Sequence, residues 1–212
     1  MQRTPGRRLS ALLGVLLAVF AAPLLGHPMP NTEIAISTGA GGATFDIAIP
    51  EPELRLALPP EWGREGDLLA EPRRTQLAGY FDDHFSVQAA AGEVVPHIVR
   101  SFTRWTAQTP EVGEYQELRV RIVVPATTGF DPHGFTLHYD AVIHQVPNHY
   151  ALVYLDRDFG TGRISSAMPV EVGVIRYDFR HDRIPPFALR LDNVGPWRGW
   201  GAAVALGFRH VL

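Results

Sequence analysis

The chain has 212 residues, a formal net charge of −3, nine histidines and no cysteine, and all of its 19 basic residues are arginine. A net negative charge argues against nucleic acid as a partner. Without cysteine the chain has neither disulfide bonds nor thiolate metal ligands, and without lysine it has no Schiff-base chemistry.

The first 26 residues have the three parts of a secretion signal. A basic start is followed by an apolar run over residues 9–25 and by the small residue Gly26. We therefore expect residues 1–26 to be a signal peptide, with cleavage after Ala21 as a competing site and an uncleaved anchor as an alternative. The next part, residues 27–195, is expected to be one extracytoplasmic domain.

From residue 33 onward, short alternating runs are separated by Gly, Pro, Asn and Asp, which is typical of a mainly β domain. Leu77, Tyr80 and Phe81 instead follow a helical spacing. We predict a single antiparallel β-sandwich-like domain with one or two short helices. In chain order the expected elements are strands at 34–37 and 45–49, a helical turn at 52–58, a helix at 71–83, and strands at 85–89, 94–106, 118–122, 135–145, 150–156, 170–174 and 187–191.

The C-terminal segment, residues 196–212, is apolar and rich in Gly and Ala. Trp197 and Trp200 stand beside Arg198 just before the apolar run, as at the entry to a membrane. We expect this segment to be the start of a transmembrane helix that is too short to span a bilayer by itself. The alternative is a terminal helix packed on the core of the domain.

Nine histidines and no cysteine favour imidazole as the metal ligand, since neutral imidazole binds nickel, copper and zinc. His144 and His149 flank a turn at 146–148 and are expected to approach each other across a hairpin, as hydrogen-bonding groups, as metal ligands or as acid–base catalysts. Along one extended strand, His138 and His144 would lie roughly 20 Å apart and would not share an ion. The other internal histidines are expected to be surface or capping residues: His84, His97, His133 and His181.

His27 is a second metal candidate. If the signal is removed after Gly26, His27 becomes the N-terminal residue, and its amino group and ring nitrogen form a bidentate chelate for copper or nickel. One further histidine close in space would complete a three-nitrogen site like that of a copper oxygenase. The alternative is an unstructured first residue.

Three segments together resemble the HupE/UreJ-like family of bacterial membrane proteins. They are His-Pro-Met-Pro-Asn at 27–31, His-Gln-Val-Pro-Asn-His at 144–149 and Leu-Gly-Phe-Arg-His-Val-Leu at 206–212. The resemblance implies a signal peptide, a periplasmic β domain and a membrane domain, of which only the opening is present here. It also implies kinship with nickel and cobalt permeases, in which His210 would be the first of the membrane histidines.

These observations predict a non-enzymatic domain at the periplasmic face of the bacterial inner membrane. Its expected role is in the transport or sensing of nickel, cobalt or copper, and it would contact the membrane through its C-terminal segment. The alternative is a free-standing periplasmic β-sandwich that binds a protein partner. The candidate metal ligands are His27, His144, His149 and His210.

Overall fold

The computed structural model describes residues 30–62, 66–110, 112–158 and 169–191. The expected signal peptide, the expected membrane segment and two of the candidate ligands, His27 and His210, lie outside the described residues. Within the described part of the chain, no helix is both long enough and apolar enough to cross a membrane.

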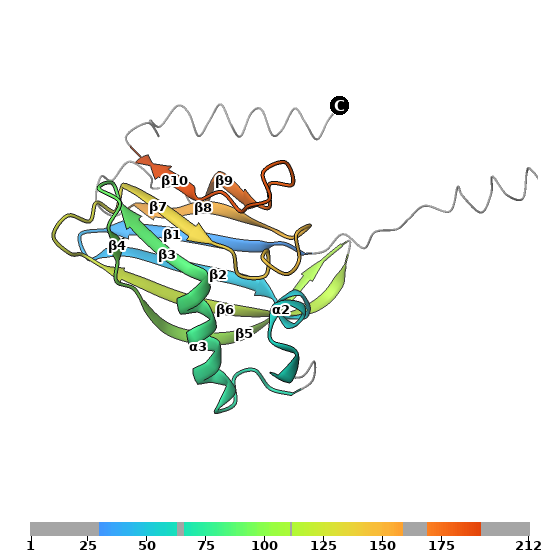
Figure 1. Ribbon diagram of the computed structural model, residues 1–212. Coiled ribbons are helices and arrows are strands. Elements are labelled where there is room, and N and C mark those ends of the chain that lie inside the picture. Colours follow the sequence, from blue (N-terminus) through green and yellow to red (C-terminus); the bar gives the residue numbers. More distant parts are fainter. Residues whose placement is uncertain (1–29, 63–65, 111, 159–168, 192–212) are drawn as a thin grey trace, which may run out of the picture.

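The described residues form two β-sheets and two α-helices (Figure 1), which confirms the predicted mainly β fold. One sheet has six strands in the order β5-β6-β2-β1-β8-β9, and the other has four in the order β10-β7-β3-β4. The elements are β1 (Thr32–Gly39), β2 (Gly42–Pro50), α2 (Glu51–Ala57), η1 (Pro60–Trp62), α3 (Arg73–His84), β3 (Phe85–Ala89), β4 (Val94–Val95), β5 (Ile98–Thr109), β6 (Gly113–Pro125), β7 (Gly134–Tyr139), β8 (Tyr150–Asp158), β9 (Val170–Arg176) and β10 (Phe187–Arg190).

The two sheets pack face to face through aromatic residues. The ring of Phe45 on β2 lies edge to face on Phe85 of β3 and on Phe135 of β7, with centroid distances of 5.0 and 5.7 Å. Edge-to-face pairs of this kind add to the stabilisation that comes from apolar burial. The core of the domain therefore lies between the sheets, as expected for a sandwich.

The alternation of side chains along the strands decides which faces form the core. On β2, Phe45, Ile47 and Ile49 are fully buried, because successive strand residues point to opposite faces of the sheet. On β6, Leu118 and Ile122 are likewise fully buried. These are the inward positions that the sequence predicts.

One strand pairing differs from the predicted antiparallel arrangement. Within the six-stranded sheet, β1 pairs with β2 in antiparallel fashion but with β8 in parallel fashion. The sheet is therefore mixed. The chain reaches β8 only after it has contributed strands to the other sheet, and a long connection of this kind lets a strand return in either direction.

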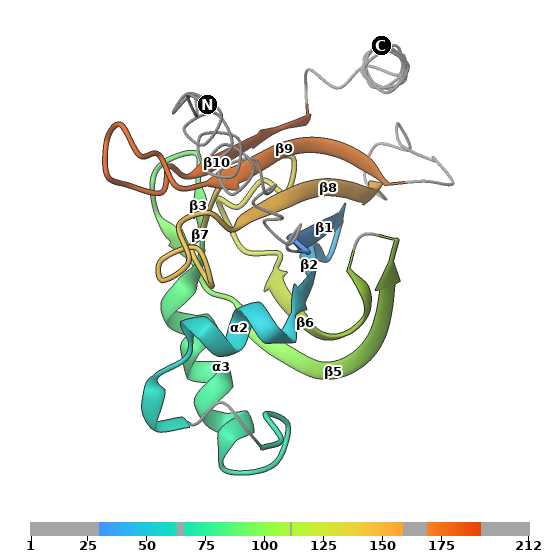
Figure 2. The same ribbon diagram turned by 90° about the vertical axis from the view of Figure 1, so that its right-hand side faces the viewer.

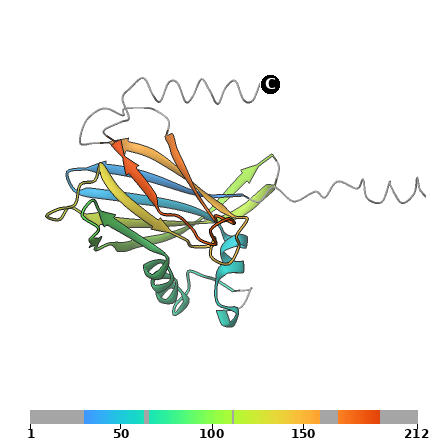
Figure 3. The ribbon, with the colours of Figure 1, turned by 45° about the horizontal axis from the view of Figure 1, so that its top comes forward.

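The helix predicted at 71–83 is present as α3, and its apolar face is the predicted one. Leu77, Tyr80 and Phe81 are buried, and the ring of Phe81 lies 5.9 Å from that of Phe102 on β5. Figure 3 shows α3 and α2 on the same side of the sandwich.

Two predicted strand boundaries are wrong. The strand predicted over 94–106 is split into β4 and β5 around Pro96, which has no backbone N–H for a ladder. The strand predicted over 135–145 ends at Tyr139 and gives way to tight turns. The residues at 141–143 are all buried, and three consecutive buried side chains do not fit the alternation of a sheet with one solvent-facing side.

Candidate functional site

The turn segment 140–149 joins β7 to β8 and contributes residues to two groups of polar side chains. We define the outer cluster as Tyr80, His84, Asp140 and His144. We define the buried cluster as Thr32, Glu53, Tyr139 and His149. Both lie at the point where β7 ends, since Tyr139 is its last residue.

The β3–β7 ladder brings His84 and Asp140 of the outer cluster together. Phe85 on β3 lies opposite Tyr139 on β7, and the ladder continues one position further because the Asp140 N–H donates to the His84 carbonyl at 3.2 Å. His84 and Asp140 thus face each other although 56 positions separate them in the chain.

Asp140 holds both imidazole rings of the outer cluster. Its carboxylate accepts a hydrogen bond from His84 Nδ1 at 2.7 Å, and its backbone carbonyl accepts one from His144 Nδ1 at 3.1 Å. Because carboxylate and carbonyl oxygens only accept, Nδ1 is the donor in both rings. In the neutral form, Nε2 of each ring therefore keeps its lone pair.

The two rings are stacked. Their centroids are 4.1 Å apart and their planes differ by 17°. Burial lowers the pKa of His144, and the positive form of His84 would lower it further, while the hydrogen bond to the Asp140 backbone opposes this shift. His144 is thus held in the neutral form that binds metals.

Tyr80 fixes the turn that carries His144. The Val142 N–H donates to the Tyr80 hydroxyl at 3.0 Å, and the Tyr80 ring lies 4.5 Å from that of His84. Val142 is fully buried and has φ of 68°, which is unfavourable for a β-branched residue. Backbone strain of this kind is concentrated at functional sites in proteins.

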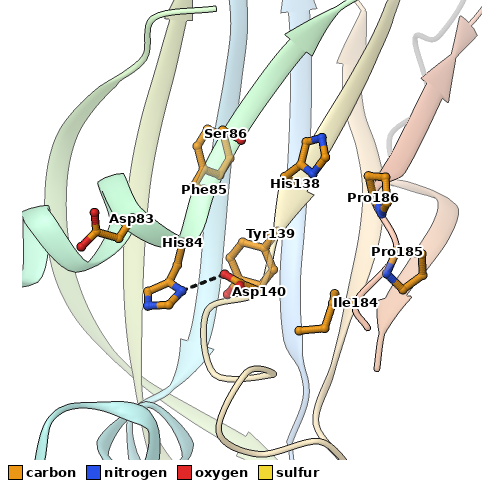
Figure 4. Close-up of a pocket in the computed structure, with 10 residues that line it drawn as sticks. All are labelled: Asp83, His84, Phe85, Ser86, His138, Tyr139, Asp140, Ile184, Pro185 and Pro186. Atoms are coloured by element: carbon orange, nitrogen blue, oxygen red, sulfur yellow. Dashed lines mark hydrogen bonds and ion pairs between the residues drawn. The ribbon is translucent and has the colours of Figure 1, made fainter. Parts of the chain in front are cut away.

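A pocket of about 230 Å³ opens beside His84 and Asp140 (Figure 4), so these two members of the outer cluster are reached from solvent. Ser86 and His138, which are cross-strand partners, line its strand side, and Figure 4 shows Ile184 and Pro185 facing them across the pocket. The full lining is Asp83, His84, Phe85, Ser86, His138, Tyr139, Asp140, Ile184, Pro185 and Pro186.

The buried cluster is closed to solvent. His149 is 2% exposed, and its Nε2 lies 2.8 Å from the Thr32 hydroxyl. Its Nδ1 lies 3.8 Å from Glu53 Oε2, which is beyond hydrogen-bond distance. Both of these atoms are buried without a hydrogen-bond partner in the described part of the chain.

Burial shifts His149 and Glu53 of this cluster towards their uncharged forms. It lowers the pKa of His149 to about 4 and raises the pKa of Glu53 above its ordinary value. Desolvation disfavours the charged state of both acids and bases. The contact at 3.8 Å is therefore not a strong ion pair, because burial disfavours the positive form of His149.

The structure thus separates the two histidines that the sequence places together. His144 belongs to the outer cluster and His149 to the buried one, because the segment between them forms turns and not the expected hairpin. Across the described ranges, no group of three or more histidine and acidic residues has the arrangement of a complete metal site.

The sequence analysis did not connect His84 with Asp140. We expected His84 to be a surface residue, and no local spacing connects it to a residue 56 positions away. The pairing of β3 with β7 is the only signal that joins them, and it is a property of the sheet.

No protein-family model matches this chain. The curated proteins compared with it include no significant relative either. The two clusters and the surfaces of the domain are therefore the basis for a functional proposal.

Proposed function

We propose that this chain is the extracytoplasmic β domain of a HupE/UreJ-like membrane protein and that it binds a divalent transition metal, nickel, cobalt or copper, through the outer cluster. Its role is non-enzymatic and serves the transport or sensing of the ion. The observation that supports metal binding is the way in which Asp140 holds His84 and His144.

A metal-binding histidine usually donates its second ring N–H to a carboxylate or a backbone carbonyl, which fixes the tautomer and the orientation of the ring. His84 and His144 both do so, each through Nδ1. Their Nε2 atoms are the ligand atoms in this proposal, and imidazole nitrogen suits nickel, cobalt and copper. Since the rings are stacked at 4.1 Å, they have to tilt apart for one ion to bind both nitrogens.

The remaining ligands are proposed to be water and the N-terminal residue of the processed chain. His27 precedes Thr32 by five residues, which span at most about 17 Å. Thr32 contacts His149, and His149 ends the segment that carries His144. The amino group and ring of His27 are therefore on a short tether to this segment, while His210 is proposed to belong to the membrane part.

Calorimetric titration of the exported chain with nickel, cobalt and copper salts tests this proposal. We expect His84→Ala and His144→Ala to weaken binding by at least tenfold each, and Asp140→Asn to weaken it by about 10–100-fold, because partners of this kind orient the ligands. His181→Ala is the matched control, since its ring is exposed and pairs only with Asp178. If His84→Ala and His144→Ala bind the ion as tightly as His181→Ala, the outer cluster is not the site.

A second candidate function, protein-partner binding, is favoured by the outer face of the six-stranded sheet. Trp105 on β5 is 57% exposed, and the guanidinium of Arg119 lies 5.0 Å from its ring centroid. Tryptophan and arginine are the residues most often found at binding hot spots. A groove of about 670 Å³ runs beside them, lined by Glu33, Ala35, Asp46, Ala48, Ser101, Thr103, Arg119, Val120, Arg121, Tyr154, Asp156 and Pro169.

Crosslinking in cells distinguishes this second function from metal binding. A partner that docks on this face should form a crosslink with the parent chain. Trp105→Ala should abolish this crosslink, whereas His84→Ala should leave it unchanged. Equal crosslinking by the parent and Trp105→Ala would remove this face from consideration.

A further inference from the structure

The segment 176–183, which begins at the last residue of β9 and forms most of the loop to β10, exposes an aromatic ring among arginines. Phe179 is 72% exposed, and its ring lies edge to face on that of Tyr177 at 5.0 Å. Figure 2 shows the loop projecting beyond the ends of the two strands that it joins. Its three arginines, all exposed, are Arg176, Arg180 and Arg183.

The loop is held in shape by its own two acids. The Asp178 N–H donates to the Arg183 carbonyl at 2.7 Å, and the Asp178 carboxylate accepts from the Arg180 N–H at 2.9 Å and contacts His181 Nδ1 at 2.7 Å. The Tyr177 hydroxyl donates to Asp182. Both carboxylates are therefore engaged inside the loop.

The arginines, in contrast, point their charge outward. None of the three guanidinium groups has an ion pair or a ring contact with another described residue. The loop thus carries three exposed arginines and two aspartates, a formal charge of +1 with His181 neutral, around an exposed aromatic ring, on a chain whose net charge is −3. This local reversal of sign is the feature that calls for a negatively charged partner.

We propose that this loop binds an anionic lipid bilayer, with Phe179 inserted at the level of the headgroups and the three arginines on lipid phosphates. Aromatic rings gather at the membrane interface, and arginines near the membrane are attracted to anionic lipids. A projecting ring with charges around it suits a deformable surface such as the interface, whereas a peptide ligand is normally held in a concave site.

The inference rests on the membrane part of the proposed function. The loop is followed by β10, which ends at Arg190, and the expected membrane segment begins at residue 196. The loop precedes β10 and the expected segment follows it, so the twelve residues 184–195 separate the two, and chain length places a bilayer entered at residue 196 within about 45 Å of the loop.

A site-specific probe tests the loop directly. The chain has no cysteine, so Phe179→Cys carries a single environment-sensitive fluorophore such as NBD. We expect its emission to shift to the blue and rise several-fold when the whole chain is mixed with vesicles of phosphatidylcholine and phosphatidylglycerol at 3:1. The matched control is Val94→Cys, which is also well exposed at 62% but lies on β4, and its emission should stay as in water.

Two further measurements separate the possible outcomes. Replacing all three arginines by glutamine, or using phosphatidylcholine alone, should abolish most of the emission change at 179. A label that stays in water while the chain sediments with the vesicles overturns the loop inference and leaves the membrane part of the proposed function in place. A chain that does not sediment with either vesicle overturns both, while metal binding, measured without lipid, is judged separately.

Discussion

At the scale of single residues, His149 and Glu53 stand out because each is buried with an unpartnered polar atom. An unsatisfied buried group costs about 1–3 kcal/mol, and both groups reduce this cost by shifting towards the neutral form. These two pKa shifts make the free energy of unfolding depend on pH, and the dependence has opposite sign for the two residues.

His149 should make the domain less stable as the pH falls. Its pKa is about 4 in the folded protein and near 6.5 in the unfolded chain, so between these values the unfolded state binds the extra proton. The unfolding free energy should therefore fall by up to about 3 kcal/mol as the pH drops from 6.5 to 4. Urea unfolding of the parent and of His149→Gln across this pH range checks the prediction. If the unfolding free energy changed with pH at the same slope in both proteins, the prediction would be contradicted.

Glu53→Gln provides the comparison of opposite sign. The pKa of Glu53 is raised in the folded state, so the folded protein binds the extra proton just above pH 4.5 and loses stability as the pH rises through that window. Glutamine has no carboxyl group to ionise, so the variant does not lose stability in this way as the pH rises. We expect Glu53→Gln to unfold at higher urea concentration than the parent at pH 8, with a smaller difference at pH 4. Lower stability at pH 8 would show that the carboxylate has a favourable role at neutral pH.

At the scale of elements, the hairpin of β1 and β2 depends on one glycine. Gly42 has φ of 112°, and a Cβ atom there would lie 2.1 Å from the Val124 carbonyl oxygen on β6. Neither the dihedral angle nor the contact tolerates a side chain. The close approach of the hairpin to β6 therefore requires glycine at this position.

Gly42→Ala should destabilise the domain by about 3 kcal/mol or more, because strain and a backbone clash act together. Gly41→Ala is the matched control in the same hairpin, since a Cβ there has no atom within 4 Å, and it should change the stability by about 1 kcal/mol or less. Thermal unfolding of the two variants checks the difference. Equal melting temperatures would mean that the hairpin relaxes away from β6.

Most elements were predictable because their periodicity is local. The strand that became β3 and the helix that became α3 follow spacings of two and of about 3.6 residues, and these reflect burial on one face. The two wrong strand boundaries lie where a different structural constraint acts. Pro96 interrupts a ladder, and the three consecutive buried residues at 141–143 belong to a turn that packs into the core.

At the scale of the whole molecule, Tyr80 connects α3 to the turn that follows β7. Its hydroxyl accepts the Val142 N–H at 3.0 Å across 62 positions of the chain. The strained φ of Val142 persists because this contact and the surrounding core hold it. The helix is thereby coupled to the position of His144.

Tyr80→Phe should cost about 1–3 kcal/mol of unfolding free energy, since it leaves a buried N–H without an acceptor. If the outer cluster binds a metal, the same variant should also weaken metal binding, because the turn that carries His144 is then held less firmly. Tyr177→Phe, which removes an exposed hydroxyl contact with Asp182, should change stability by about 0.5 kcal/mol or less. Urea unfolding and metal titration of both variants check this, and equal effects would contradict the role given to Tyr80.

The sequence by itself determined the fold class, the inward faces of the strands and the apolar face of α3, because these depend on burial patterns that repeat within a few residues. It also singled out His144 and His149 as candidate ligands, a prediction that stays a prediction. Only the tertiary structure decided that they lie in different clusters and that His84 and Asp140 complete the outer one. Strand pairing joins positions far apart in the chain, and no local spacing carries that information.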